Sequence, residues 1–300
     1  MLGSVQDAED VLQEALMRVW QGLGRFEGRS SLRVWMYRVV TNACLTALRS
    51  RARRVLPLGV VGPTDPRAEG DLVELDVPWL EPYPVPEGAD GVRGAPDASY
   101  EQRESVELAF VAALQHLSPN ERAVLLLREV VGFSAREIAA QLDTTTAAVT
   151  SALQRARQRV EGRLPSPSQQ EVRRMLGDAG VRALVARYMD AMARADVTAV
   201  VRLLTDDATW SMPPLPSWYR GRADIAVFLE RYPLTERWRH VPTTVNAQAA
   251  VAGYRWDDEA RAFVGWVVDV LTLRGDRIAA VTGFLGLGHV TRLGLPDRLD

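Results

Sequence analysis

Cysteine, lysine and long apolar runs are scarce or absent in this sequence. The single cysteine, Cys44, excludes an internal disulfide, and its apolar helical setting predicts a buried, unreactive thiol rather than part of a metal cluster. The sequence contains no run of about 18 apolar residues, and acids rather than a basic-then-apolar leader follow Met1. These absences favour a cytoplasmic globular protein with no membrane segment, and we expect neither metal nor cofactor.

Charge is divided unevenly along the 300 residues, although the net charge is only −2. All 36 basic residues are arginine, and nine of them lie in residues 18–54 beside a single acid, Glu27. Residues 65–107 reverse the balance, with twelve acids and three arginines. The basic segment interleaves arginine with Phe26, Trp35 and Tyr37, a pattern that favours a nucleic-acid surface over a merely solvated face.

Hydrophobic periodicity predicts helices on both sides of a linker. Apolar residues recur every three or four positions in residues 7–23 and again from residue 32 to about residue 50, which is typical of two amphipathic helices joined by a short polar loop. Residues 55–99 are rich in proline, glycine and acids and predict a linker. Its island Trp-Leu-Glu-Pro-Tyr-Pro, residues 79–84, is expected to dock on a neighbouring part of the chain.

A helix-turn-helix is the clearest motif. Periodicity resumes near Tyr100, and Ser118 and Ser134 are each followed three residues later by glutamate, the capping-box pattern that starts a helix. Gly132 can close the helix between them. The second helix of the motif should turn outward Thr145, Thr146, Ala147, Thr150, Ser151, Gln154 and Arg155. Such a face fits the DNA major groove, and a solvated αα-hairpin is the alternative.

Beyond Pro165 and Pro167 the pattern changes to helices followed by strands, which predicts an α+β domain. Helices are expected near residues 181–192, 197–204 and 223–232, and strands over 241–254, 262–273 and 277–285 with a hairpin turn at 274–276. Candidate general bases are Asp206, Asp207, His240, Asp269 and His289. A cap or turn role is favoured for the two adjacent aspartates, and a structural role for the histidines. One set of apolar residues either lines a ligand pocket or forms part of a simple core: Trp210, Met212, Trp218, Tyr219, Phe228, Trp266 and Phe284.

Several segments together resemble a known family. Residues 7–20 (DAEDVLQEALMRVW), 26–42 (FEGRSSLRVWMYRVVTN), 117–122 (LSPNER), 138–142 (IAAQL) and 154–157 (QRAR) resemble conserved regions 2 and 4 of bacterial extracytoplasmic-function (ECF) sigma factors of the sigma-70 family. The segment from residue 178 resembles the SnoaL-like branch of the NTF2-like cone fold, and residues 79–84 resemble a linker motif of sigma factors that carry such a domain.

The resemblance implies a multidomain fold. Two all-α sigma domains, residues 1–54 (region 2) and 100–164 (region 4), would flank the linker of residues 55–99, and an α+β NTF2-like cone domain would occupy residues 178–300. The family usually has a further helix before residue 7, so either the start is truncated or that helix is absent. No enzymatic activity is implied.

The resemblance also implies partners and site residues. A sigma factor binds core RNA polymerase and directs it to promoter DNA, and here the C-terminal domain would regulate that engagement by docking on the linker or the sigma regions. Polymerase-binding positions would be Asp10, Gln13, Glu14 and Arg18. Positions that contact and melt the −10 element would be Phe26, Arg29, Ser30, Ser31, Arg33, Trp35, Arg38 and Asn42. The −35 element would be read by Thr145, Thr146, Ala147, Thr150, Ser151 and Arg155.

Two other interpretations stay open on the residues alone. A dimeric helix-turn-helix regulator would read a symmetric operator but has no use for the basic N-terminal segment. A small-molecule enzyme using the cone pocket would turn over a substrate within residues 178–300.

Overall fold

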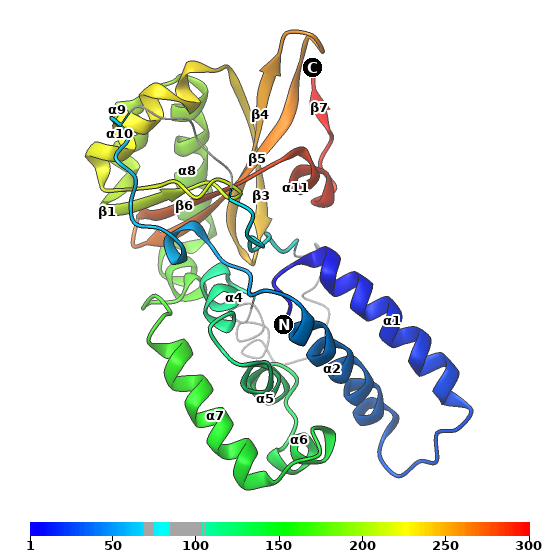
Figure 1. Cartoon of the computed structure of the whole chain (residues 1–300). Helices are drawn as coiled ribbons and strands as arrows, with labels where there is room; N and C mark the ends of the chain where they lie inside the picture. The colour runs from blue at the N-terminus through cyan, green and yellow to red at the C-terminus, as the bar shows by residue number, and fades with distance from the viewer. Residues whose placement is uncertain (69–74, 85–103, 105) are drawn as a thin grey trace. The chain divides into compact units, whose positions relative to one another are not determined.

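The computed structural model describes residues 1–68, 75–84, 104 and 106–300, and the chain forms two compact units (Figure 1). The first unit comprises Met1–Arg54 and Leu108–Pro165. The second comprises Val55–Glu107 and Ser166–Asp300. Among the described residues, no helix combines the length and apolar character needed to cross a membrane.

The first unit begins with two helices, α1 (Val5–Leu23) and α2 (Leu32–Ser50), as the periodicity predicted. Serine caps both: the Ser4 side chain accepts a hydrogen bond from the Asp7 amide, and Ser31 accepts one from Val34. Their shared core contains Leu2, Val11, Ala15 and Ala43. Cys44 is half-buried beside this core, and burial raises the pKa of its thiol, in keeping with an unreactive cysteine.

The apolar stripe of α1 is wider than its buried face. Only Val11 and Ala15 of this helix are buried. Leu12, Leu16 and Trp20, which belong to the apolar repeat of residues 7–23, are 45%, 47% and 80% exposed. Periodicity identified the helix correctly, but it could not show which residues of the apolar stripe the rest of the unit covers.

Four shorter helices complete the first unit: α4 (Leu108–Leu114), α5 (Pro119–Glu129), α6 (Ala135–Gln141) and α7 (Thr146–Glu161). Both predicted capping boxes are present, at the starts of α5 and α6. Gly132 has a positive φ of 82° after α5, and Asp143 adopts a left-handed φ of 50° in the turn between α6 and α7. The helix-turn-helix is confirmed, and Asp143 takes the place of the usual glycine.

The second unit is a mixed sheet covered by helices. Within its described part the strand order is β2-β1-β6-β5-β4-β3, and β7 (Arg298–Leu299) pairs with β5. The strands are β1 (Leu204–Ser211), β2 (Trp218–Arg220), β3 (Trp238–Val245), β4 (Gln248–Asp257), β5 (Ala262–Arg274) and β6 (Arg277–Leu285). The β1–β6 pairing is parallel and the other pairings are antiparallel.

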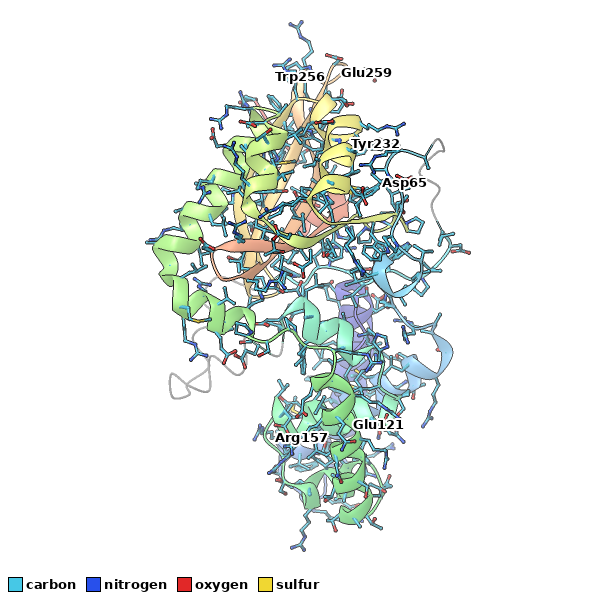
Figure 2. All side chains as sticks on the ribbon, turned by 90° about the vertical axis from the view of Figure 1, so that its left-hand side faces the viewer. Asp65, Glu121, Arg157, Tyr232, Trp256 and Glu259 are labelled. Atoms are coloured by element: carbon cyan, nitrogen blue, oxygen red, sulfur yellow. The ribbon has the colours of Figure 1, made fainter. Side chains whose placement is uncertain are left out.

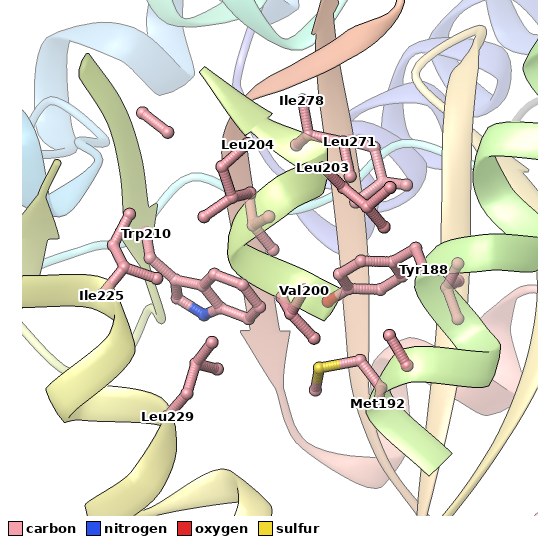
Figure 3. Close-up of a cluster of buried hydrophobic side chains, with 14 of the residues drawn as sticks. Tyr188, Met192, Val200, Leu203, Leu204, Trp210, Ile225, Leu229, Leu271 and Ile278 are labelled. Carbon is pink, nitrogen blue, oxygen red and sulfur yellow. The ribbon is translucent and has the colours of Figure 1, made fainter. Parts of the chain in front are cut away.

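Helices lie against this sheet, and α8, α9 and α10 contribute to its large hydrophobic core. They are α8 (Gln169–Ala193), α9 (Val197–Leu203), α10 (Arg222–Arg231) and α11 (Leu287–Arg292), with short 3-10 helices at Pro57–Gly59 and Pro233–Thr235. Figure 3 shows the centre of the core, where Tyr188 and Met192 of α8 lie near Trp210 of β1 and Leu229 of α10. The α+β prediction is confirmed.

The strand predicted over residues 241–254 is wrong, because this run is a hairpin. Strands β3 and β4 pair from Trp238–Arg255 to Val245–Gln248, and the turn between them is Asn246-Ala247, with φ of 53° and 54°. Two left-handed residues suit the twist of a two-residue hairpin, but alanine rarely adopts this conformation. The sequence therefore lacks the Asn-Gly signal that would have revealed the turn.

Candidate nucleic-acid interface and C-terminal cavity

Helix α7 has one buried and one exposed face. Val149, Ala156 and Val160 are buried against the other helices of the unit. The predicted −35 positions are all exposed: Thr145, Thr146, Ala147, Thr150, Ser151 and Arg155. Thr145 is the N-cap, and its hydroxyl accepts from the Ala148 amide at 3.1 Å. The first two turns of α7 therefore present small polar side chains to solvent, a geometry suited to close approach to base edges.

An acidic residue orients the arginines further along α7. The Glu121 carboxylate is almost fully buried and accepts from Arg155 Nε at 3.1 Å and from Arg159 Nη1 at 2.5 Å. Burial alone would raise the pKa of Glu121, but hydrogen bonds from Ser118 and the two arginines hold it below its usual value. A third arginine, Arg157, pairs with Glu129 at 2.6 Å (Glu121 and Arg157 are marked in Figure 2). Sequence reasoning missed Glu121 in this role.

The predicted melting positions include an aromatic pair. The rings of Phe26 and Trp35 are tilted at 44° with centroids 5.3 Å apart, and both side chains are half-buried. A Cβ at Gly22 would lie only 3.0 Å from the Trp35 ring. Glycine at this position therefore leaves room for the indole. Arg29 is exposed and pairs with Glu27 at 2.8 Å. Ser30 and Ser31 are also exposed, and Ser31 is the N-cap of α2.

Two of the predicted −10 arginines contact residues of the helix-turn-helix. Arg33 donates to the Val131 carbonyl at 2.9 Å, and its guanidinium lies 4.9 Å from the centroid of the Phe133 ring. Arg38 Nη2 donates to both carboxylate oxygens of Asp143, at 2.9 and 2.8 Å. Asn42 is exposed on the same helix. Sequence reasoning did not anticipate that these arginines would already be engaged within the first unit.

The predicted polymerase positions lie on exposed turns of α1. Asp10, Gln13, Glu14 and Arg18 are all exposed, and Glu14 pairs with Arg18 at 2.5 Å. Next to them is a shallow apolar groove, absent from the sequence-based prediction, which is lined by Glu9, Leu12, Gln13, Leu16, Met17, Trp20 and Gln21.

In the second unit, Asp206 and Asp207 were expected at a cap or turn, and that expectation is wrong. Both lie within strand β1, exposed, where Asp206 pairs with Arg222 at 2.6 Å and Asp207 pairs with Arg274. His289 packs its ring against Phe284, with centroids 6.0 Å apart, and burial lowers the pKa of this imidazole. None of these three candidates lines the cavity that contains His240 and Asp269.

His240 and Asp269 line one cavity of about 360 Å³. Asp269 is 4% exposed and its Oδ2 accepts from the Tyr188 hydroxyl at 2.8 Å. Burial raises the pKa of Asp269 to about 6, although the tyrosine hydrogen bond opposes this rise. Both ring nitrogens of His240 are buried and have no hydrogen-bond partner among the described residues, and burial lowers its pKa to about 4.

The predicted aromatic set divides between this cavity and the solid core. Trp210, Met212, Phe228 and Trp266 line the cavity. The other three are buried without lining it: Trp218, Tyr219 and Phe284. In the part of the chain that the structure describes, no cluster of three histidine, cysteine or acidic residues could hold a metal ion.

Described residues of the linker contact the C-terminal part of the second unit, residues 166–300, at several places, two of which carry most of the hydrogen bonds. Near α10, Trp218 Nε1 donates to the Val61 carbonyl at 2.8 Å, Arg231 donates to the Pro66 carbonyl at 2.7 Å, and Arg67 pairs with Asp224 at 2.7 Å. Asp65 and Tyr232 mark these two segments in Figure 2. The remainder of the acidic linker, residues 69–74 and 85–103, lies outside the described residues.

The second place is the β3–β4 turn. Asn246 exchanges hydrogen bonds with Tyr83: the Asn246 amide donates to the Tyr83 carbonyl at 2.9 Å, and the Tyr83 amide donates to Asn246 Oδ1 at 3.0 Å. The Asn246 side chain also donates to the Val106 carbonyl at 2.8 Å. Leu80, in the same island, is 1% exposed. These contacts supply hydrogen bonds that hold the unusual turn.

The helix-turn-helix has an exposed N-terminal face, arginines lie in the loop after α1 and along helix α2, and the α+β domain encloses a cavity, an arrangement typical of a modular DNA-binding protein. Family models agree part by part. Residues 1–54 match Sigma-70 region 2, residues 107–160 match Sigma-70 region 4, and residues 185–281 match the SnoaL-like domain.

Individual relatives extend the match over the whole chain. The chain is 41% identical over 308 residues to the ECF RNA polymerase sigma factor SigG of Mycobacterium tuberculosis, covering 100% of this chain and 80% of that protein. It is 30% identical over 218 residues to SigJ of the same organism, covering 70% of this chain and 58% of SigJ. The crystal structure of SigJ shares the fold, with a TM-score of 0.59 and 24% identity over 98% of this chain and 92% of that one. The chain belongs to the ECF RNA polymerase sigma factors.

Proposed function

We propose that the chain binds core RNA polymerase in the cytoplasm and directs it to promoters, with α7 reading the −35 element as duplex DNA. The exposed N-terminal face of α7 carries this proposal. Thr146, Ala147, Thr150 and Ser151 form a surface of small side chains opposite the buried Val149. Small side chains allow the helix to enter the major groove closely, where hydroxyl groups can pair with base edges.

The loop of residues 26–31 and helix α2 would open the −10 element. The half-buried Phe26–Trp35 pair offers an aromatic surface on which an unstacked base can lie. Arg29, Ser30 and Ser31 follow Phe26 in the same loop and are exposed, so they would supply hydrogen-bond donors and acceptors. Arginines of the loop and of α2 that lie along the bound DNA strand would attract its phosphates.

Engagement of this surface requires a rearrangement within the first unit. Arg33 donates to the Val131 carbonyl and lies over the Phe133 ring. Arg38 is hydrogen-bonded to Asp143. The two arginines would exchange these partners for DNA phosphates when polymerase separates α2 from the helix-turn-helix. The exposed side of α1, with Asp10, Gln13, Glu14 and Arg18, would provide the polymerase contact.

Transcription with site variants tests the −35 assignment. Purified chain and core polymerase would be assayed on a promoter library randomised over the −35 and −10 elements. The double variant Thr146→Ala with Ser151→Ala should lose about tenfold or more output from promoters that depend on the −35 element. Gln158→Ala, an exposed position in the last turns of α7, is the matched control and should leave output unchanged. Equal output from all three chains would reject the role of α7.

We further propose that the C-terminal domain regulates this activity through the linker. The hydrogen bonds of Val61, Pro66 and Tyr83 with residues of the second unit support this role, because they tie the segment between the two sigma regions to the cone domain. A chain ending near Leu164 would test it. Promoter output should change when the domain is removed, and identical output from the full and shortened chains would reject regulation.

A further inference from the structure

The segment that joins region 2 to region 4, residues 55–107, folds back on itself where it leaves region 2. The Val55 amide donates to the Pro78 carbonyl at 3.0 Å, and the Leu80 amide donates to the Val55 carbonyl at 2.8 Å. The Leu80 side chain is 1% exposed, which anchors this contact in the second unit. The chain therefore returns at residue 80 to the point that it left at residue 55, and the residues between add no distance between the two sigma regions.

A second closure of this connecting segment lies at Asn246 in the β3–β4 turn. The Tyr83 amide donates to Asn246 Oδ1 at 3.0 Å, and Asn246 Nδ2 donates to the Val106 carbonyl at 2.8 Å. One fully buried asparagine thus holds two points of the segment together. The chain from Leu80 to Tyr83 is short, roughly 10 Å when extended. The start and the end of the connecting segment are therefore joined by a short path of contacts.

The end of the connecting segment is also fixed, by the start of helix α8. The Glu107 carboxyl is 4% exposed and accepts from the Gln169 amide at 3.2 Å and the Gln170 amide at 2.9 Å. The Ser168 hydroxyl donates to Glu104 at 2.7 Å. Burial raises the pKa of Glu107 to about 7, although the two backbone amides oppose this rise. The residues that enter region 4 and those that leave it are thereby held together.

The two glutamines connect these contacts to the sheet. Gln169 Nε2 donates to the Leu273 carbonyl at 3.0 Å, and Gln169 Oε1 accepts from the Leu273 amide at 2.6 Å. Gln170 Nε2 donates to the Ala247 carbonyl at 2.8 Å, next to Asn246 in the β3–β4 turn. Each hydrogen bond contributes modestly to stability, and the buried network as a whole selects one arrangement of the chain.

This arrangement limits the reach of the connecting segment. Fully extended, residues 55–107 could span roughly 170 Å, but the closures at Val55 and Asn246 leave little of that length available. Promoter elements more than one helical turn apart lie more than about 34 Å from each other. In the free chain, by contrast, Arg38 of region 2 contacts Asp143 of region 4 directly. A chain that reads both elements at once must therefore lengthen the connection between its sigma regions.

We propose that the C-terminal domain limits the separation of the two sigma regions by holding the connecting segment folded back through Asn246 and Glu107, and that these contacts open when the chain binds core RNA polymerase. This inference rests on the proposed function, because it supplies the physical step by which the domain would regulate promoter engagement. The closed form predominates in the free chain, and polymerase binds the open form. The apparent affinity then falls with the open fraction, so weakening the contacts strengthens polymerase binding.

Two substitutions weaken the contacts without removing an apolar core side chain. Asn246→Gly keeps a residue that tolerates the left-handed turn and removes both side-chain hydrogen bonds. Glu107→Gln keeps the size of the side chain but replaces one acceptor oxygen by a donor that faces backbone amides. Their matched controls lie in the exposed β4–β5 turn: Arg261→Gly, also at a left-handed φ, and Glu259→Gln.

Binding of each full-length chain to immobilised core RNA polymerase, measured by surface plasmon resonance, tests the inference. Asn246→Gly should bind about tenfold more tightly than the parent, since two hydrogen bonds no longer oppose opening, and Glu107→Gln should also bind more tightly. Both controls should match the parent. A merely structural role predicts the opposite sign, because a damaged fold binds more weakly.

Hydrogen exchange followed by mass spectrometry checks the fold and the contacts of the same chains. In Asn246→Gly, peptides that contain Tyr83 should exchange faster, whereas peptides from β1 and β6 should stay as protected as in the parent. Unchanged exchange at Tyr83, or binding no tighter than the parent with β1 and β6 protected, would overturn the inference. If β1 and β6 lose protection, this variant is unfolded and the affinity of Glu107→Gln decides in its place.

The parent chain separates this inference from the proposed function. A parent that does not bind core polymerase would overturn the proposed function and the inference with it. A parent that binds as tightly as both variants would overturn the inference alone.

Discussion

Replacing Asp269 by asparagine should make the stability of the second unit less dependent on pH. The carboxyl is 4% exposed, and its Oδ2 accepts a hydrogen bond from Tyr188 at 2.8 Å. An asparagine side-chain oxygen can accept the same hydrogen bond without carrying a charge. The substitution therefore removes ionisation while keeping the size of the side chain and its principal partner.

The magnitude follows from the pKa. Burial raises the pKa of Asp269 from its ordinary 3.8 to about 6, so the folded state holds the proton more tightly than the unfolded state. The unfolding free energy of the parent chain should fall as pH rises from about 4 to 6, by roughly 3 kcal/mol at 1.36 kcal/mol per pKa unit, and should then level off. Asp269→Asn lacks this decrease, so the free-energy difference between variant and parent should move by that amount in favour of the variant.

Urea unfolding followed by tryptophan fluorescence, at pH 4 and pH 7.5, measures the effect. Trp210, 3% exposed in the same core, reports on this unit. Asp276→Asn, in the exposed β5–β6 turn, is the control and should unfold with the same pH dependence as the parent chain, because Asp269 is unchanged. A difference between Asp269→Asn and the parent that is the same at both pH values would refute the burial argument, as would a variant that loses relative stability at higher pH.

Three other substitutions have definite expected outcomes. Phe26→Ala should reduce permanganate reactivity of promoter thymines more than it reduces duplex binding; equal losses would place Phe26 in a structural role. Arg38→Ala removes an exposed pair with Asp143 and should change the unfolding free energy by less than about 1 kcal/mol in thermal denaturation, so a larger loss would contradict its surface character. Gly283→Ala should destabilise the chain by about 1–3 kcal/mol because its Cβ meets a buried carboxyl, whereas Gly288→Ala, with open space around it, should not; similar urea midpoints for the two would refute the steric argument.

Features that depend on residues close together in the sequence were predictable. The capping boxes at Ser118 and Ser134 and the Gly275-Asp276 hairpin turn depend on residues a few positions apart, and all three are present. The family and the fold class followed from several such local patterns in a fixed order. The residues assigned to DNA and polymerase stay predictions, although α7 exposes every proposed −35 position.

Features that depend on distant partners were not predictable. The hairpin at Asn246-Ala247 escaped notice because its stabilising hydrogen bonds come from Tyr83 and Val106, far away in the sequence. Likewise, nothing local to Arg38 indicates Asp143, 105 residues away. Periodicity shows which face of an element is apolar or polar, but only the folded chain shows which groups meet there.

Promoter-specific transcription with purified core RNA polymerase tests the central claim most directly. The full chain, added to core polymerase and the randomised promoter library, should produce discrete transcripts that share −35 and −10 sequences, and core polymerase alone should not. A correctly folded chain that binds DNA but gives no polymerase-dependent initiation would contradict the assignment as a sigma factor and favour a simple helix-turn-helix regulator.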